Sequence, residues 1–90
     1  MGKGVILTTK HGAGGMLNVY GEAAAGVKDN SNRVFNTTGN YVFGTLKVYY
    51  NGQRLCSHDF NENGADEFVL TYVKPYNEDC LVVDYVLQNL

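Results

Sequence analysis

The chain has 90 residues, which is enough for one domain with a single thin core, and its 44% hydrophobic content is ordinary for a globular protein. Its formal net charge of −2 comes from charged residues scattered along the chain, so no basic stripe could neutralise a phosphate backbone. The longest aliphatic runs, residues 5–7 and 81–83, are far shorter than a membrane span or a signal-peptide core. We therefore expect no nucleic-acid partner, no membrane partner and a protein that starts soluble and unexported.

The first thirty residues are rich in glycine and differ in character from the rest. Seven of the eleven glycines fall within them. Dense glycine costs backbone entropy and supplies little side chain to bury, so this segment needs support from the domain or from another subunit. Residues 5–9 resemble a strand, residues 16–20 are a short apolar piece, and residues 21–26 are too short for a stable helix. We divide the chain into an N-terminal arm, residues 1–30, and a folded domain, residues 31–90.

Regular strand patterning begins after a cluster of turn-forming residues at 29–32, whose side chains bond their own backbone. The strongest local signal follows at Asn51-Gly52, between β-branched and aromatic residues at 45–50 and a returning run at 53–57. Asn-Gly favours a two-residue hairpin turn because both residues accept positive φ. These segments are predicted to form a β-hairpin.

The predicted register of this hairpin separates a core face from an open face. A two-residue turn pairs Tyr50 with Gln53 and Val48 with Leu55, with Leu46 opposite residue 57. Leu46, Val48 and Leu55 then share the face that we expect in the core. The open face meets solvent or a neighbour and places Tyr49 opposite Arg54, as in a cation–π pair; it carries Lys47, Tyr49, Arg54 and Cys56.

Two further strands are predicted in the C-terminal third. Residues 67–73 alternate after a polar turn at residues 61–66, and Pro75 follows that strand and stops it because proline cannot donate to a ladder. A turn at residues 77–79 leads into residues 80–87, which alternate with the period of a half-buried strand. In the first strand both faces are expected to be at least partly covered, one with Phe68, Leu70 and Tyr72 and the other with Val69, Thr71 and Val73. In the second strand the side chains expected to face the core are Leu81, Val83, Tyr85 and Leu87.

The spacing of these segments predicts an all-β protein. Four short strands at near-regular intervals, with one or two more from the first half, are typical of a small antiparallel β-sandwich or a partly open barrel. The glycine-rich segment would extend from that domain as an N-terminal arm. The aromatic content of 12%, with seven Tyr residues, and the single Pro also favour strands.

Two groups of residues contain side chains of the types found in catalytic or metal sites. Cys56 and His58 are two apart, as a nucleophile and base on one strand face could be, but nothing in the sequence orients His58 or supplies an oxyanion hole. Cys56, His58, Cys80 and His11 have the ligand types of a zinc site without its paired close spacing. We expect no catalytic residue, no metal or cofactor site and no enzyme activity. The two thiols are expected to be reduced and to pack as small apolar residues, with a disulfide as the alternative.

Three local motifs each match part of a known functional pattern. Residues 59–64 match the opening of a calcium loop, but the twelfth position, which needs Glu, is Leu70. A polar turn is favoured, and a weak ion site is the alternative, formed by Asp59, Asn61, Asn63 and Asp66 or Glu67. Residues 12–15 are glycine-rich without the Lys-Ser/Thr pair of a phosphate-binding loop, so we expect a flexible loop there. Asn36-Thr37-Thr38 is a glycosylation sequon, which has meaning only in a secreted protein.

The tyrosines offer a possible contact surface. Tyr supplies amphipathic contact area at low entropy cost, so exposed tyrosines favour interfaces and can stack on sugar rings. Ordinary filling of a sheet accounts for them about equally well, because Tyr is common in strands. The residues considered are Tyr20, Tyr41, Tyr49 and Tyr76.

Residues 41–85 carry an ordered set of motif positions. The pattern reads G-T-L-x-V-x-x-N-G-x-x-L, then D-[FY], F-x-L, a proline-containing loop and D-x-L-x-V-x-Y. It is carried by Gly44, Thr45, Leu46, Val48, Asn51, Gly52, Leu55, Asp59, Phe60, Phe68, Leu70, Pro75, Asp79, Leu81, Val83 and Tyr85. In this order and spacing the stretch resembles a β-sandwich module of tailed-bacteriophage virion proteins, with Cys80 as a departure in the closing strand. The first forty residues match no part of the pattern.

The resemblance implies a non-enzymatic structural protein of the virion, assembled in the host cytoplasm. Because the chain is short and begins at Met1, we expect a capsid decoration (cement) protein or a small fibre subunit on the particle surface. Its expected partners are further copies of itself, as a homotrimer, and other virion proteins such as the major capsid or tail proteins. The arm would dock on neighbouring subunits by adding to a sheet edge. The alternative is a tail-fibre module that binds cell-surface glycan or a receptor in a shallow groove of exposed Tyr and Asn residues.

Overall fold

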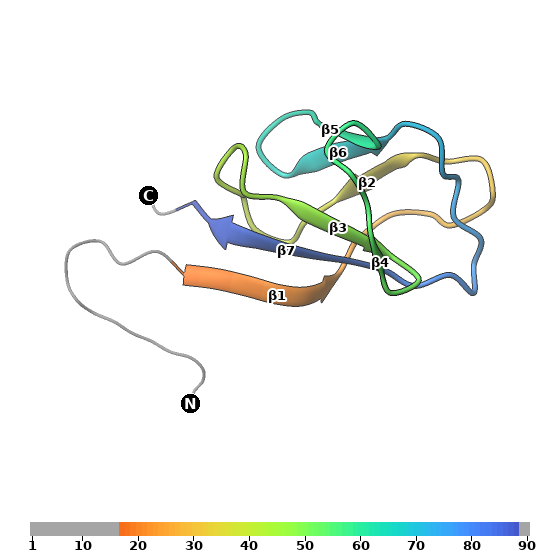
Figure 1. Ribbon diagram of the computed structural model, residues 1–90, viewed down its shortest axis with the longest axis horizontal. Helices are drawn as coiled ribbons and strands as arrows, with labels where there is room; N and C mark the ends of the chain where they lie inside the picture. The colour runs from red at the N-terminus through yellow and green to blue at the C-terminus, as the bar shows by residue number, and fades with distance from the viewer. Residues whose placement is uncertain (1–16, 89–90) are drawn as a thin grey trace.

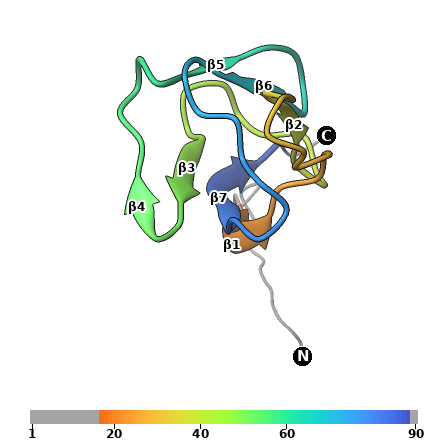
Figure 2. The same ribbon diagram turned by 90° about the vertical axis from the view of Figure 1, so that its right-hand side faces the viewer.

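The computed structural model describes residues 17–88, which form two antiparallel sheets that face each other (Figures 1 and 2). The four-stranded sheet has the order β1-β7-β3-β4, and the three-stranded sheet has the order β2-β6-β5. None of the described residues is helical, so the predicted all-β sandwich is confirmed. The strands are β1 (Leu17–Ala23), β2 (Val34–Asn36), β3 (Lys47–Tyr50), β4 (Gln53–Arg54), β5 (Phe60–Glu62), β6 (Glu67–Leu70) and β7 (Leu81–Leu87).

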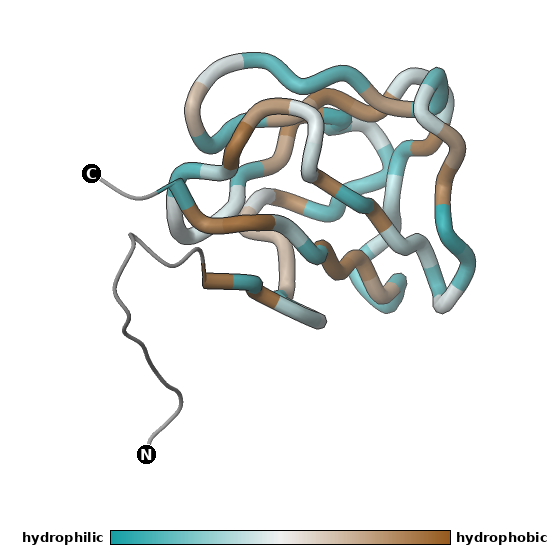
Figure 3. The backbone as a smooth tube through the Cα atoms, turned by 60° about the vertical axis from the view of Figure 1, so that its left-hand side comes forward, coloured by the Kyte–Doolittle hydropathy of each residue, from teal (hydrophilic) through white to brown (hydrophobic). Residues whose placement is uncertain are grey.

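A single hydrophobic core fills the space between the sheets. Buried and half-buried positions alternate along β7, and hydrophobic residues recur along the strands (Figure 3); burying them removes apolar surface from water. Leu55 and Leu87 are half-buried and pack against this core. The inward faces predicted for the hairpin and for the strand at residues 80–87 are therefore confirmed. The buried hydrophobic residues are Phe35, Tyr41, Leu46, Val48, Phe60, Phe68, Leu70, Leu81, Val83 and Tyr85.

The predicted hairpin forms with the predicted register. β3 and β4 pair Tyr50 with Gln53 and Tyr49 with Arg54. The turn residues Asn51 and Gly52 have φ values of 51° and 86°, as a hairpin turn with two left-handed residues requires. Beyond the short β4, the pairing continues through a bond of 2.9 Å from the Leu55 N–H to the Val48 carbonyl.

The element boundaries on both sides of β6 differ from the sequence prediction. The strand predicted at residues 67–73 ends at Leu70, because the chain then crosses to the other sheet, and Tyr72, predicted to be at least partly covered, is 73% exposed. The polar turn predicted at residues 61–66 is shorter, because the buried Phe60 pairs with Leu70 and brings the next two residues into β5. The remaining turn uses Gly64 at a φ of 107°.

Part of the glycine-rich segment belongs to the four-stranded sheet. β1 lies at the edge of that sheet and pairs antiparallel with β7. The strand predicted at residues 5–9 and the glycine run at residues 12–15 lie outside the described residues. The division of the chain into residues 1–30 and 31–90 stays a prediction.

Two carboxylates organise the loops. Asp29 accepts hydrogen bonds from the backbone N–H groups of Asn32 and Ser31, which confirms the predicted turn and lowers the pKa of its carboxyl. Asp79 accepts bonds from the Tyr50 hydroxyl at 2.7 Å and from the Tyr76 N–H at 2.8 Å, and these lower its pKa. The second carboxylate thereby joins the end of β3 to the turn that precedes β7.

A buried tyrosine on β7 joins β1 to the loop that follows β2. The Tyr85 hydroxyl donates to Glu22 Oε1 at 2.7 Å and accepts from the Gly39 N–H at 3.1 Å. Glu22 Oε2 in turn accepts from the Thr38 N–H at 2.7 Å. Burial, together with the Glu22 carboxylate, raises the pKa of Tyr85 to about 12, so the phenol stays protonated in the folded protein.

We expect Tyr85→Phe to lower the free energy of unfolding by about 1–3 kcal/mol at neutral pH, because two partly buried polar groups, the Glu22 carboxylate and the Gly39 N–H, lose their partner. In the unfolded chain a tyrosine ionises near pH 10, below its pKa in the fold. The contribution of the hydroxyl is therefore complete below about pH 10 and is lost as the pH rises toward about 12. Urea unfolding across this range should show the gap between wild type and variant closing.

Tyr20→Phe is the matched control, because the Tyr20 side chain is 74% exposed. We expect this variant to unfold like the wild type at every pH. A gap between wild type and Tyr85→Phe that stays constant from neutral pH to about pH 12 would contradict the assignment.

Candidate binding face

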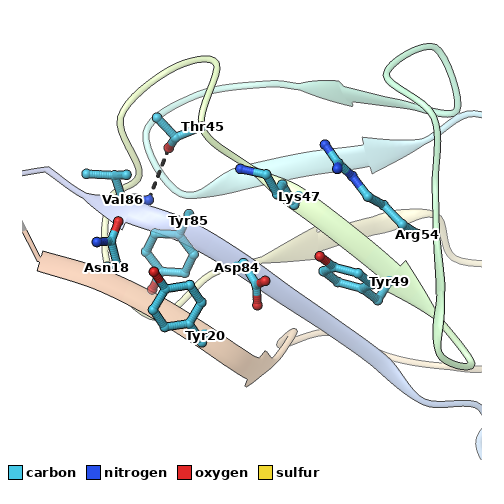
Figure 4. A pocket seen from close by; sticks show the side chains of 9 residues that line it. All are labelled: Asn18, Tyr20, Thr45, Lys47, Tyr49, Arg54, Asp84, Tyr85 and Val86. Atoms are coloured by element: carbon cyan, nitrogen blue, oxygen red, sulfur yellow. Dashed lines mark hydrogen bonds between the residues drawn. The ribbon is translucent and has the colours of Figure 1, made fainter.

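The outer face of the four-stranded sheet carries a shallow hollow of about 280 Å³ (Figure 4). The hollow lies over β7, between β1 on one side and the β3–β4 hairpin on the other. A size near 300 Å³ and a mixture of aromatic and polar side chains are typical of small ligand sites. The lining residues are Asn18, Tyr20, Thr45, Lys47, Tyr49, Arg54, Asp84, Tyr85 and Val86.

Strand alternation points most of these side chains away from the core. Lys47 pairs with Asp84 across β3 and β7, and the adjacent residues on each strand face inward. Tyr49 pairs with Arg54 across the hairpin. The predicted open face of the hairpin is therefore confirmed for these three hairpin residues. Cys56, predicted on the same face, is exposed but lies outside the hollow.

A β-bulge in β1 sets the position of Tyr20. The register of β1 against β7 shifts between Val19 and Glu22, so that Tyr20 and Gly21 together face Asp84. Gly21 takes a φ of 65° and donates its N–H to Asp84 Oδ1 at 2.7 Å. Bulges beside sites commonly re-aim a side chain, and here Tyr20 projects from the edge strand over the hollow. This bulge was not predicted from the sequence, although a glycine inside a strand pattern is its usual signal.

The hollow contains two cationic side chains that are available to a ligand. Lys47 and Arg54 are exposed. In the described part of the chain, Lys28 and Arg33 donate hydrogen bonds to backbone carbonyls, whereas Lys47 and Arg54 do not. Asp84 is the carboxylate among the lining residues, and its Oδ1 is already bonded to the bulge. Two cations, two tyrosine rings and one acceptor are suited to binding a polar ligand.

The described residues of the two disfavoured patterns, Cys56, His58 and Cys80, lie outside the strands. β4 ends at Arg54, so Cys56 and His58 lie in the connection to β5 and do not share a strand face. Cys56 and Cys80 are free and exposed, so the expectation that they pack as small apolar residues is wrong. His11 lies outside the described residues. Within residues 17–88, no three His, Cys, Asp or Glu side chains are grouped to hold a metal ion.

The residues of the calcium-loop match make local hydrogen bonds. Asp59 Oδ2 accepts from the Cys56 N–H at 3.2 Å, and the Asn63 amide donates to Glu67 Oε1 at 2.6 Å. Asn61 is part of β5 and not of a turn. These contacts stabilise a strand-to-strand connection, as the favoured interpretation of the motif requires.

The tyrosines considered as a contact surface separate into two groups. Tyr20 and Tyr76 are exposed and Tyr49 is half-buried, whereas Tyr41 is 3% exposed and belongs to the core. The Tyr41 hydroxyl donates to the Glu67 carbonyl, which satisfies it there. Sequence alternation also missed Phe43, which is 77% exposed beside a second hollow of about 330 Å³.

Comparison with known proteins found no match to a family model, a curated protein or a solved structure. In the part of the chain that the structure describes, no helix has the length and apolar character needed to cross a membrane. The proposal of a function therefore rests on the geometry of the described residues and on the motif resemblance of residues 41–85.

Proposed function

We propose that the chain is a non-enzymatic structural subunit of a bacteriophage virion, a capsid decoration (cement) protein or small fibre subunit on the particle surface. Its partners are further copies of itself, as a homotrimer, and virion proteins such as the major capsid or tail proteins. The observation that carries the proposal is the outer edge of β1, which pairs only with β7 among the described residues. The two-sheet fold also agrees with the motif resemblance.

The edge of β1 is the longest that the sandwich presents. β1 has seven residues, whereas the other edge strands, β2, β4 and β5, have two or three. An open edge offers unpaired backbone groups to another chain, and proteins normally cover or interrupt such an edge. A strand added from a neighbouring subunit would cover residues 17–20 by main-chain hydrogen bonds. The part of the glycine-rich arm at residues 1–16 lies directly before β1 in the sequence, which suits it to reach a neighbour.

We expect the full chain to form a trimer or larger assembly in solution, measured by light scattering on a sizing column. Deleting residues 2–15 should reduce it to a monomer that keeps the β-rich circular dichroism spectrum. The deletion stops before residue 17 because removing residues 1–30 would also remove β1. A full chain that is a stable monomer at high concentration would contradict the cement proposal.

A point substitution tests the edge itself. Leu17 is 51% exposed on β1, and Leu17→Lys places a charge where an added strand would pack. This change should weaken association by about tenfold or more, whereas Tyr72→Lys, in an exposed connection between sheets, should leave it unchanged. Equal effects of the two substitutions would argue against the edge as the interface.

The second candidate function is a carbohydrate- or receptor-binding fibre module. The observation that favours it is the hollow on the four-stranded sheet, with Tyr20 and Tyr49 on opposite sides of Asp84 (Figure 4). Tyrosine rings offer apolar faces and hydroxyl groups together, which suits sugar rings that have the same mixed character. Saturable binding of a soluble oligosaccharide to this face tests the candidate.

A further inference from the structure

We infer that the hollow on the four-stranded sheet binds an acidic saccharide, whose carboxylate lies at Lys47 and Arg54 and whose ring lies against the tyrosines. The inference rests on the second candidate function and narrows its ligand to sugars that carry a carboxylate. It uses the side chains of Asn18 and Tyr20 on the outer face of β1, whereas the assembly proposal uses the backbone edge of the same strand.

The charge of the hollow favours an anion. Lys47 on β3 and Arg54 on β4 extend toward the same end of the hollow, away from the Asp84 carboxylate (Figure 4). The guanidinium group of Arg presents a planar fork that matches a carboxylate, and Lys adds a point charge beside it. Asp84 faces Lys47 in the register, but its Oδ1 is bonded to the Gly21 N–H. Two cations against one partly engaged carboxylate leave the hollow with a local excess of positive charge.

The rest of the hollow is suited to a sugar ring. Tyr20 from β1 and Tyr49 from β3 bracket Asp84 (Figure 4), so a ring above β7 can contact an aromatic side chain on either side. Asp84 can accept a hydrogen bond from a sugar hydroxyl, and the Asn18 amide can donate or accept. Thr45 is less available, because its Oγ1 already donates to the Val42 carbonyl and accepts from the Val86 N–H.

The charge distribution favours a saccharide over a nucleic acid. Nucleic-acid binding draws its affinity from many phosphate contacts made by a basic surface. Here the cations over the hollow are Lys47 and Arg54, and the whole chain has a formal net charge of −2. Two cations suffice for a single carboxylate. A thymidine oligonucleotide therefore serves as a negative control.

The test is a ¹H–¹⁵N NMR titration of the full chain with trigalacturonic acid and with its methyl ester, which differ only in charge at the carboxyl groups. We expect saturable shifts of the amides of Tyr20, Gly21, Lys47 and Asp84, with the acid binding about tenfold or more tightly than the ester. Raising the salt concentration should weaken binding of the acid and leave that of the ester unchanged, because salt screens exposed charges.

The double variant Lys47→Gln/Arg54→Gln should lower the affinity for the acid to that for the ester. The control Lys74→Gln, at an exposed residue in the connection from β6 to β7, should change neither affinity. Equal binding of acid and ester by the wild type would overturn the charge inference and leave glycan binding in place. Failure to bind either probe, or tighter binding of the oligonucleotide, would overturn the inference. None of these outcomes affects the assembly proposal, which the mass measurement tests separately.

Discussion

Phe68→Ala is expected to lower the free energy of unfolding by about 3–5 kcal/mol. Phe68 is 0% exposed in β6, the central strand of the three-stranded sheet, with Phe35 and Glu62 as its partners on either side. Its ring lies 6.3 Å from that of Phe35, centre to centre. Truncation removes buried apolar surface and leaves a cavity that two flanking strands keep open.

A loss of this size is a large part of the total stability of a small domain, which is about 5–15 kcal/mol. Urea unfolding followed by circular dichroism measures it, and the midpoint of thermal unfolding should fall steeply as well. Phe43→Ala is the matched control, because Phe43 is exposed in a turn, and should change stability by no more than about 0.5 kcal/mol. Similar losses in both variants would show that Phe68 is not at the centre of the core.

Gly26→Ala is expected to cost about 2–4 kcal/mol, although it adds only a methyl group. Gly26 has a φ of 149°, which side-chain-bearing residues rarely adopt. A Cβ built there would lie 2.5 Å from Phe35 Cδ2 and 3.1 Å from the Val34 carbonyl oxygen. Phe35 is completely buried, so its ring can move only by displacing the core.

Gly44→Ala separates backbone strain from the steric clash. Gly44 also has a positive φ, 91°, but a Cβ there would meet nothing within 4 Å. Gly26→Ala should therefore cost more than Gly44→Ala by the overpacking contribution, about 1–3 kcal/mol. Adding Phe35→Leu should recover part of that difference in a double-mutant cycle. Additive effects in the cycle would mean that the methyl group and the ring do not collide.

The parts of the fold that could be predicted are a hairpin and a strand whose pairing or alternation lies within a single sheet. The Asn51-Gly52 turn fixed the register of β3 against β4, since the turn type sets which residues pair. β7 alternates over its full length because it is central, with β1 and β3 on its sides. Local sequence therefore contained enough information for both elements.

The errors occurred where tertiary contacts override alternation. Tyr72 continues the apolar alternation of β6, but the chain has left that sheet and the residue is exposed. Tyr41 was considered as a surface residue, but it is buried against Tyr85, with ring centres 6.4 Å apart. Neither position can be assigned without knowing which sheet the neighbouring segments join.

Only the part of the candidate site that lies on the hairpin could be predicted from the sequence. The hairpin contributes Lys47, Tyr49 and Arg54, and their common face followed from the turn. Tyr20 and Asp84 come from two strands far apart in the sequence, and a bulge brings them together. A shift of register of this kind is encoded by the pairing of β1 with β7 and not by either strand alone.

The pairing of Leu17 with Leu87 has a consequence for how the domain can be carried by a larger polypeptide. The first residues of β1 and the last residues of β7 lie side by side at one end of the sheet (Figure 1). A host protein could accept residues 17–88 within one surface loop without moving the ends of that loop apart, as in tolerated domain insertions. Joining the same two ends by a short linker would give a circular chain, and opening that chain at another loop would give a circular permutant.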